Sequence, residues 1–358
     1  MFKLNYSKLF LVIFIAFNFT TAQTPEYYIS VDFSQQGDAL KVQLSNLITN
    51  THTTDIPYTS SSTTDTWDIL RISDLENPSS ENVLLIYGFD DNDGTFKTDR
   101  TRNAFETCHS NSCIGLWNRE HVFAKSLADP SLITNDPGSG TDVHNLRPAD
   151  SQKNSQRNNR LFIDDSGAAS KIVNGDYFFP GDEWKGDVAR IIMYMYLRYP
   201  SQCQAIDSAT GSANYSPNGD MPDVFLEWNV EDPVSAFELT RNDVIFSYQS
   251  NRNPFIDNPY LATLIWNGPA AVDSWGTLST SFENETSVYI SPTITNRSIT
   301  INGLKDDNYD IVIYNQLGQK MKYFTTSKTI DVSSFPSGLY ILNLKSSKGI
   351  YHLKFIVK

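Results

Sequence analysis

The hydrophobic pattern of this chain changes near Gly268, and the change divides the sequence into two regions of different fold class. Before Gly268, apolar residues recur at helical spacing in several segments, and short apolar runs typical of strands lie between these segments. From Val288 onward, the sequence shows only the short alternating runs that are typical of strands. We therefore expect an α+β domain over 23–268, a linker rich in Ser, Thr, Asn and Gly over 269–287, and a small all-β sandwich domain over 288–358.

Individual elements of the first region follow from spacing and capping signals. Asp187 is a candidate N-cap for a long buried helix that continues to Tyr199. Pro148 is a helix-start signal for a segment that continues to Arg160. We also expect helices over 34–49, 234–248 and 260–266, strands over 83–87 and 117–123, loops over 49–66 and 129–140, and, in the second region, strands over 299–301, 309–314, 338–344 and 351–357.

The beginning of the chain has the organisation of an export signal. Lys3 and Lys8 give a positive start to an apolar run over 9–17, and the small residues that follow suit cleavage after Ala22. The alternative is an uncleaved membrane anchor, but the run is shorter than the ~20 residues that a span needs. No later segment is long and apolar enough to span a membrane. We expect a signal peptide over 1–22 and a secreted protein without a stable membrane span.

The acidic composition counts against a simple nucleic-acid binder, because such a protein carries a basic face. The formal net charge is -13 and the sequence pI is about 4.8. Net charge does not locate charge, however, and the single acid Asp150 lies among four basic residues, namely Arg147, Lys153, Arg157 and Arg160. A local basic patch would suffice for a cleft that contacts few phosphates, and a bound divalent cation would add positive charge there.

The three cysteines leave two interpretations open. In an exported protein, Cys108 and Cys113 could form a disulfide that closes a short loop, which would leave Cys203 unpaired. Alternatively, Cys108, His109 and Cys113 could bind zinc together with a distant histidine. Export favours the disulfide, and no second ligand pair of matching spacing follows in the sequence.

Two segments, 117–126 and 140–158, are more polar than a core or a simple turn requires, and they contain His121 and His144. In the hydrolysis of a phosphodiester a water molecule loses a proton as it attacks, so a base with a pKa near neutrality is useful, and histidine is the usual choice. Charge that grows on the phosphate and on the leaving oxygen is stabilised by a hard cation such as Mg²⁺, which takes oxygen ligands. The two segments therefore indicate phosphodiester chemistry.

Each part of this chemistry has a candidate residue. His121 is available as the base, and Glu120 and Asn154 offer oxygen ligands to a metal. Arg147 and Arg157 are candidate phosphate clamps, because a guanidinium binds non-bridging oxygens in a fork geometry. Adjacent strand residues point to opposite faces, so Glu120 and His121 can share a site only at a strand end, a bulge or a strongly twisted position.

The first region resembles the bacterial endonuclease I family, in Asn-Arg-Glu-His over 118–121, Asp-Val-His-Asn-Leu-Arg-Pro-Ala over 142–149 and Asn-Ser-Gln-Arg-Asn over 154–158. The resemblance spans roughly Tyr27 to Trp266, with further motifs such as Leu-Glu-Trp at 226–228. Members of this family are extracellular or periplasmic nucleases of the ββα-metal, or His-Me finger, type. The resemblance implies an α+β fold in which a ββα-metal nuclease core is surrounded by helices.

The resemblance also implies a role for each matching residue. His121 would be the general base that activates water, and Glu120 and Asn154 would bind a single Mg²⁺, with Ca²⁺ or Mn²⁺ as alternatives. The metal would stabilise the leaving 3′ oxygen, so that cleavage of DNA or RNA gives 5′-phosphate ends with little sequence preference. His144 and Asn118 would support the site.

The phosphate-binding arginine of the family has no direct counterpart. Some members carry it between the catalytic histidine and the Asp-x-His-Asn segment, but residues 127–140 contain no arginine here. Arg147 is the substitute that we expect as a catalytic residue, and a salt bridge to Asp142 or Asp150 is the alternative. Further candidates for phosphate contact, each of which could instead form a structural ion pair, are Arg157, Arg241 and Arg252.

The second region is similar to the type IX secretion sorting domain, in segments that include Tyr-Asn-Gln-Leu-Gly at 314–318 and the final Lys-Phe-Ile-Val-Lys at 354–358. This similarity implies passage through the outer membrane, followed by release or surface attachment. The expected partners are a nucleic-acid substrate and the type IX secretion machinery, and we expect a monomer.

Two other function classes remain to be weighed. A decayed nuclease displayed as a binding module is disfavoured, because Glu120, His121 and Asn154 are all present. A zinc hydrolase built on Cys108 and Cys113 is the other class, although no His-Glu-x-x-His segment occurs in the sequence.

Overall fold

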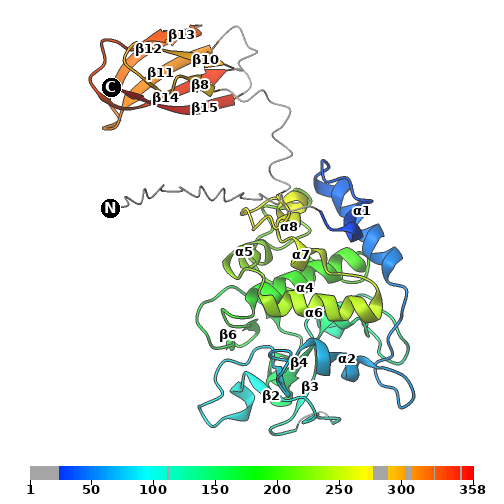
Figure 1. Ribbon diagram of the computed structural model, residues 1–358. Helices are drawn as coiled ribbons and strands as arrows, with labels where there is room; N and C mark the ends of the chain where they lie inside the picture. Colours follow the sequence, from blue (N-terminus) through cyan, green and yellow to red (C-terminus); the bar gives the residue numbers. More distant parts are fainter. Residues whose placement is uncertain (1–23, 111–112, 277–288, 303–308, 326, 347–348) are drawn as a thin grey trace, which may run out of the picture. The chain divides into compact units, whose positions relative to one another are not determined.

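The computed structural model describes residues 24–110, 113–276, 289–302, 309–325, 327–346 and 349–358. The chain forms two compact units, Met1–Thr277 and Leu278–Lys358, which we call the N-terminal and C-terminal units (Figure 1). The predicted signal peptide lies outside the described residues, and so does the predicted linker from residue 277 onward.

The N-terminal unit extends beyond the boundary expected at Gly268. Trp275 is 7% exposed, and the centre of its ring lies 4.7 Å from that of Tyr28. Tyr28 is itself completely buried. Residues 269–276 therefore belong to the packed unit, because an indole of this size gains more by burial in the core than by exposure in a linker.

A buried helix, α4 (Lys185–Arg198), lies at the centre of the N-terminal unit, and its residues from Gly186 to Leu197 are all buried. It confirms the predicted long helix, but its N-cap is Trp184 and Asp187 lies in the first turn. The Asp187 carboxylate accepts a hydrogen bond from Arg147 instead of capping the helix. The helices in contact with α4 are α1 (Gly37–Thr51), α5 (Asp223–Glu231) and α7 (Pro254–Asp257), and α7 in turn contacts α8 (Tyr260–Trp266).

Two further helices, α2 (Thr66–Ser73) and α6 (Ala236–Gln249), pack against one another. Both begin with a capping box, formed at α2 by Asp65 and at α6 by Ser235 with Glu238. Helix α6 confirms the helix predicted over 234–248. Helix α2 escaped prediction because eight residues are too few to establish a helical period.

The strands of the N-terminal unit are short and form separate small sheets. The predicted strand over 83–87 is β1 (Asn82–Leu84), which ends early, and Tyr87 adopts a left-handed φ of 73°. Strand β1 pairs with β2, and β7 lies between two other strands. The bounds of these strands are Thr101–Asn103 for β2, Leu161–Phe162 for β5, Lys171–Val173 for β6 and Tyr177–Phe179 for β7.

An antiparallel pair of strands, β3 (Trp117–His121) and β4 (Leu146–Asp150), is followed directly by helix α3 (Ser151–Arg157), which contacts both strands. Strand β3 confirms the strand predicted from residue 117. The helix predicted from Pro148 is wrong at its start, because Pro148 lies within β4. Helix α3 begins after Asp150, whose carboxylate accepts hydrogen bonds from the first turn of the helix.

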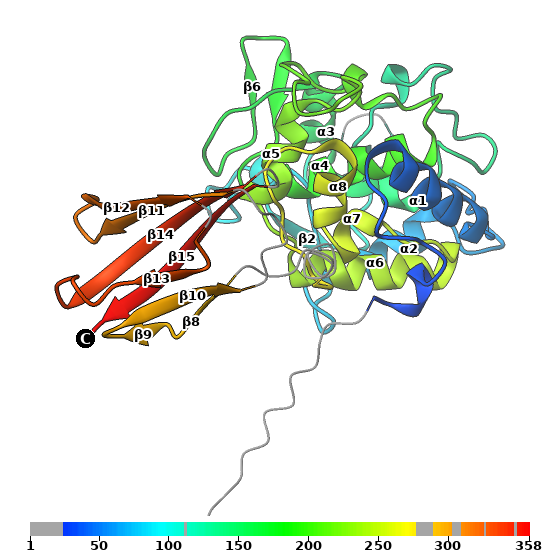
Figure 2. The ribbon, with the colours of Figure 1, turned by 90° about the horizontal axis from the view of Figure 1, so that it is seen from above.

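The C-terminal unit consists of two sheets with one shared hydrophobic core (Figure 2). Alternating residues point into this core, for example Ile311 and Ile313 from one sheet and Ile299 and Ile301 from the other. The smaller sheet contains β8 (Tyr289–Ser291), β10 (Ser298–Asn302) and β13 (Thr329–Asp331). The larger contains β9 (Ile294–Thr295), β11 (Tyr309–Asn315), β12 (Lys320–Thr325), β14 (Gly338–Ser346) and β15 (Gly349–Val357).

The predicted fold class is therefore confirmed at the level of an α+β unit followed by an all-β sandwich. Within the described part of the chain, no helix combines the length and the apolar character that crossing a membrane requires.

Candidate active site

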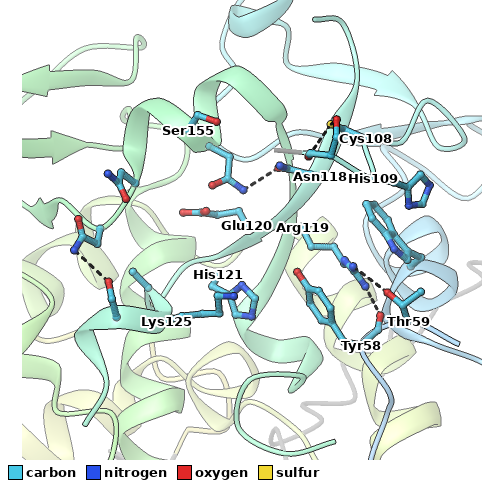
Figure 3. A pocket seen from close by; sticks show the side chains of 17 residues that line it. Tyr58, Thr59, Cys108, His109, Asn118, Arg119, Glu120, His121, Lys125 and Ser155 are labelled. Carbon is cyan, nitrogen blue, oxygen red and sulfur yellow. Dashed lines mark hydrogen bonds between the residues drawn. The ribbon is translucent and has the colours of Figure 1, made fainter. Parts of the chain in front are cut away.

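Strand β3 and helix α3 bring four of the predicted site residues to one cavity of 690 Å³ (Figure 3). These residues are Asn118, Glu120 and His121 on β3 and Asn154 on α3. His121 is the last residue of its strand. Because the regular alternation of side chains stops where a strand ends, the adjacent Glu120 and His121 can both line the cavity.

The imidazole of His121 is almost completely buried, with 7% of the residue exposed. Its Nε2 lies 2.8 Å from the carbonyl oxygen of Gly140, and its ring stacks on Tyr58 with 5.7 Å between ring centres. Burial lowers the pKa of His121 to about 3, so the ring is neutral at physiological pH. A neutral imidazole that donates its Nε2–H to a carbonyl keeps a lone pair on Nδ1, as a base requires.

The carboxyl group of Glu120 is also buried, with 2% of the residue exposed. The Tyr87 hydroxyl donates to Oε1 of Glu120 at 3.1 Å, and Nε of Arg157 lies 3.5 Å from the same oxygen. Burial raises the pKa of Glu120 to about 7, and the charge of Arg157 opposes this rise. A positive charge in the cavity would stabilise the ionised carboxylate further.

Asn154 is held by its neighbour on β3. Its Nδ2 donates to Oδ1 of Asn118 at 2.8 Å. This contact fixes the amide plane and does not use Oδ1 of Asn154, the atom that could bind a metal. The predicted supporting role of Asn118 thus has a defined geometry.

The donor set of the cavity suits a hard divalent cation. Glu120 contributes carboxylate oxygen and Asn154 contributes amide oxygen. Among the described residues, no group of three or more His, Cys, Asp or Glu side chains is placed to hold a metal ion. A metal at this place would therefore take one carboxylate, one amide and several waters, a coordination that Mg²⁺ accepts readily.

Arg147 does not line the cavity, and the prediction that it contacts substrate phosphate is wrong. The residue is completely buried, with Nε 2.6 Å from Oδ1 of Asp74 and Nη1 2.6 Å from Oδ1 of Asp187. The alternative of a salt bridge is correct in kind, although its partners are not Asp142 or Asp150. A guanidinium held by two buried carboxylates has no free face for a phosphate.

Arg241 and Arg252 also lie outside the cavity lining. Arg241 is buried, pairs with Asp74 and donates to two backbone carbonyls of the segment before and within β4. Arg252 pairs with Asp257 at 2.7 Å and with Asp243 at 2.8 Å. These contacts correct the expectation that the two arginines bind phosphate, since both guanidinium groups are engaged in structural ion pairs.

Arg157 lies behind the cavity and does not line it. It is completely buried, and besides its approach to Glu120 it donates to the carbonyls of Val122 and Asn158, each at 2.8 Å. The expected phosphate contact is thus replaced by a contact with the carboxylate that lines the cavity.

His144 packs beneath the site without reaching it. The residue is completely buried, its Nε2 lies 3.3 Å from the carbonyl oxygen of Asn251, and its ring centre lies 4.4 Å from that of Tyr194. Burial lowers the pKa of His144 to about 3. These contacts agree with a supporting role, in which His144 fixes the segment that connects Gly140 to β4.

Cys108 and Cys113 form a disulfide, while Cys203 is free and buried. The disulfide rules out the zinc site considered for Cys108, His109 and Cys113, because the two sulfur atoms are bonded to each other. Cys108 and His109 both line the cavity. The disulfide-bonded Cys108 and its neighbour His109 are therefore part of the cavity wall.

Among the cavity residues to which the sequence assigned no role are Tyr58, Arg119 and Lys125. Arg119 and Lys125 belong to the polar segment around His121, and that proximity was the available signal. Tyr58 lies in a segment expected to be a surface loop, and nothing in the local sequence indicates that its ring would stack on His121.

Comparison with known proteins assigns both units. The family model for endonuclease I matches residues 36–260, and the model for the secretion system C-terminal sorting domain matches residues 287–358. The chain is 36% identical to an extracellular ribonuclease of Bacillus subtilis over 255 residues, which are 68% of this chain and 80% of the relative. It is also 36% identical to an extracellular ribonuclease of Bacillus amyloliquefaciens, over 69% of this chain and 80% of the relative.

A more distant relative is endonuclease-1 of Buchnera aphidicola, with 26% identity over 32% of this chain and 46% of the relative. The sorting domain and the extracellular relatives establish a secreted or surface-attached protein. The match over most of the N-terminal unit and the match over the C-terminal unit together give the assignment: the chain belongs to the endonuclease I family and carries a type IX secretion C-terminal sorting domain.

Proposed function

We propose that this protein is a metal-dependent endonuclease that hydrolyses phosphodiester bonds in RNA, DNA or both, with little sequence preference and with 5′-phosphate products. The observation that carries this proposal is the meeting of Glu120, His121 and Asn154 at one cavity. The family assignment and the extracellular ribonucleases among the relatives support a nuclease.

The β3–β4–α3 unit is the proposed ββα-metal core. Its two antiparallel strands and the helix that contacts both supply the candidate base and the candidate metal ligands. In this arrangement the strand end carries Glu120 and His121, and the helix carries Asn154. The surrounding helices of the N-terminal unit support this small core.

Glu120 and Asn154 would hold the metal, for which Mg²⁺ is the first choice and Ca²⁺ and Mn²⁺ are alternatives. When bound, such an ion stabilises negative charge on the phosphate and on the leaving 3′ oxygen. Asn118 fixes the Asn154 amide, and Arg157 and Tyr87 fix Glu120.

His121 is the proposed general base. Burial keeps its ring neutral, and the hydrogen bond with Gly140 keeps the ring oriented. The ring takes a proton from a water molecule as that water attacks phosphorus. The negative charge of the phosphodiester stabilises the imidazolium that forms transiently.

Lys125 is the proposed phosphate contact in place of Arg147. It lines the cavity and is exposed, and the described residues provide no carboxylate in an ion pair with it. Lys125 lines the same cavity as His121, and this shared lining supports a contact with the reacting phosphate. An unpaired ammonium group at this position would bind a non-bridging oxygen as a point charge.

The C-terminal unit takes no part in the proposed chemistry. We propose that the type IX secretion machinery recognises it and that the mature enzyme acts as a monomer outside the cell. The separate hydrophobic cores of the two units are consistent with separate roles in catalysis and in secretion.

The test uses the purified full chain with plasmid DNA and with a structured RNA. Cleavage should require Mg²⁺, stop in EDTA and resume when Mg²⁺ is restored. A ligase should join the untreated DNA products, because they carry 5′ phosphates. Treatment of the products with phosphatase should abolish this ligation. A folded protein that cleaves neither substrate with Mg²⁺, Ca²⁺ or Mn²⁺ would contradict the proposal.

A further inference from the structure

The cavity is larger than the proposed chemistry needs. A volume of 690 Å³ lies within the range of about 300–1,000 Å³ that holds a complete small organic ligand. A metal and one phosphate group would occupy only the part near Glu120, His121 and Asn154. The remaining part has a different lining, which includes Tyr58 and His109.

This second part is walled by a continuous row of planar groups, which we call the planar row: His121, Tyr58, Arg119, Trp67 and His109. The ring centres of His121 and Tyr58 are 5.7 Å apart at an interplanar angle of 27°. The Arg119 guanidinium lies 3.4 Å from the ring centre of Tyr58 and 4.1 Å from that of Trp67. The ring centres of Trp67 and His109 are 5.0 Å apart.

The row runs from the candidate base to the exposed side chain of His109 (Figure 3). Its middle is held rigidly, because Trp67 is 4% exposed and Arg119 donates to the Tyr58 carbonyl and to the hydroxyl groups of Thr66 and Thr59. Tyr58 is half-buried. The planar row is therefore a preformed surface with an accessible end.

The charge of the planar row defines its ligand. Arg119 is in no ion pair with any residue that the structure describes, so its positive charge is available to an anionic ligand. Aromatic and guanidinium planes together suit a flat π system, and the unpaired charge suits a phosphodiester backbone. A nucleotide strand has both features. The inner groups of the row stack on one another, so a base would extend the row by stacking on its exposed end, His109. A nucleobase inside a duplex is covered on both faces by its neighbours, so only an unstacked base can do this.

We propose that the planar row is a nucleobase-binding subsite in the same cavity as the scissile phosphate, and that it makes single-stranded nucleic acid the preferred substrate. This inference rests on the proposed function for the position of the phosphate. His109 is the element of the row that the base reaches first, and Tyr58 lies nearest to the bond that breaks.

The test compares a 12-nucleotide single strand with the same strand annealed to its complement, using the full chain in Mg²⁺. Stacking predicts that wild type has a kcat/KM at least about 10-fold higher for the single strand, and that His109→Ala lowers this value about 5- to 20-fold, mainly through KM. His109→Phe keeps a planar ring and should restore the value. Phe105→Ala is the matched control, since Phe105 is 75% exposed but does not line the cavity.

Binding is measured separately, so that the subsite and the chemistry can fail independently. The probe is the same single strand with 2-aminopurine, titrated in EDTA, where stacking quenches its fluorescence. Quenching that His109→Ala weakens supports the subsite even if no metal gives cleavage, an outcome that would reject only the proposed function. If His109→Ala changes kcat/KM for the single strand and for the duplex by the same factor, or changes neither, the proposed subsite is wrong. The proposed nuclease function would not be affected by that result.

Discussion

The carbonyl oxygen of Gly140 lies 2.8 Å from Nε2 of His121. This single contact joins the end of a long loop to the candidate base, and it fixes which ring nitrogen carries the proton. Gly140 is buried, and a Cβ atom placed on it would lie 1.9 Å from the carbonyl oxygen of Ile133. The close approach of these two backbone segments therefore requires glycine at this position.

Gly140→Ala should lower kcat by about 10-fold or more while the protein remains folded, since misplacing a catalytic group by ~1 Å can cost 10²-fold. The added methyl group must displace the backbone, and the carbonyl that holds His121 moves with it. Steady-state kinetics beside a thermal unfolding curve would measure the effect. Ser139→Ala, one residue earlier, is the control and should retain the wild-type kcat. Equal rates for both variants would show that Gly140 does not position the base.

Arg147→Ala should destabilise the N-terminal unit by about 3–5 kcal/mol, because it leaves Asp74 and Asp187 buried without their partner. Urea unfolding measures the loss. Arg100→Ala is the control, since Arg100 forms exposed pairs and should cost no more than ~1 kcal/mol. If Arg147→Ala instead leaves the free energy of unfolding unchanged and raises KM, Arg147 contacts the substrate.

Lys125→Ala should raise KM for nucleic acid by about 10-fold, the effect expected for one charge-assisted hydrogen bond. Lys125→Arg keeps the positive charge and should stay close to wild type. Lys171→Ala removes a partly exposed lysine that pairs with Asp165 outside the cavity, and it should have no effect on KM. If all three variants share the wild-type KM, another group must bind the phosphate.

The buried His144 should make folding sensitive to acid. Its pKa is lowered to about 3 in the folded chain, mainly by burial, whereas an unfolded chain has the ordinary value near 6.5. The unfolded state therefore takes up a proton first as the pH falls. Stability is complete above about pH 6.5 and is lost progressively toward pH 3, at about 1.4 kcal/mol per pH unit for each such group. Urea unfolding between pH 7 and pH 4 should show a shallower dependence for His144→Asn than for wild type. Identical slopes would reject this origin.

The part of the site that could be predicted from the sequence is the part that lies within local motifs. Asn118, Glu120 and His121 are neighbours on one strand, and Asn154 follows on the helix that packs against it. The order of these motifs along the chain was sufficient to predict that these residues share one site.

The errors concern long-range partners. Arg147 lies in a polar motif, but its ion-pair partners are Asp74 at the end of α2 and Asp187 in the first turn of α4. No local pattern in the sequence indicates that these residues lie next to β4. Tyr58 is distant from His121 in the chain, and its stacking depends on how the segment before α2 folds back. Pro148 shows the limit of a local signal, because pairing with β3 overrides its preference for a helix start.

The most direct test of His121 as the general base is the rate of Mg²⁺-dependent cleavage by His121→Ala. Wild type is measured in parallel, and unfolding curves are recorded for both proteins. We expect a fall in kcat of at least about 100-fold, the usual contribution of a general base, in a protein that is still folded. Added imidazole should restore part of the lost rate. A folded His121→Ala protein that cleaves within about 2-fold of the wild-type rate would contradict the assignment of His121 as the base, since general-base catalysis contributes far more than that.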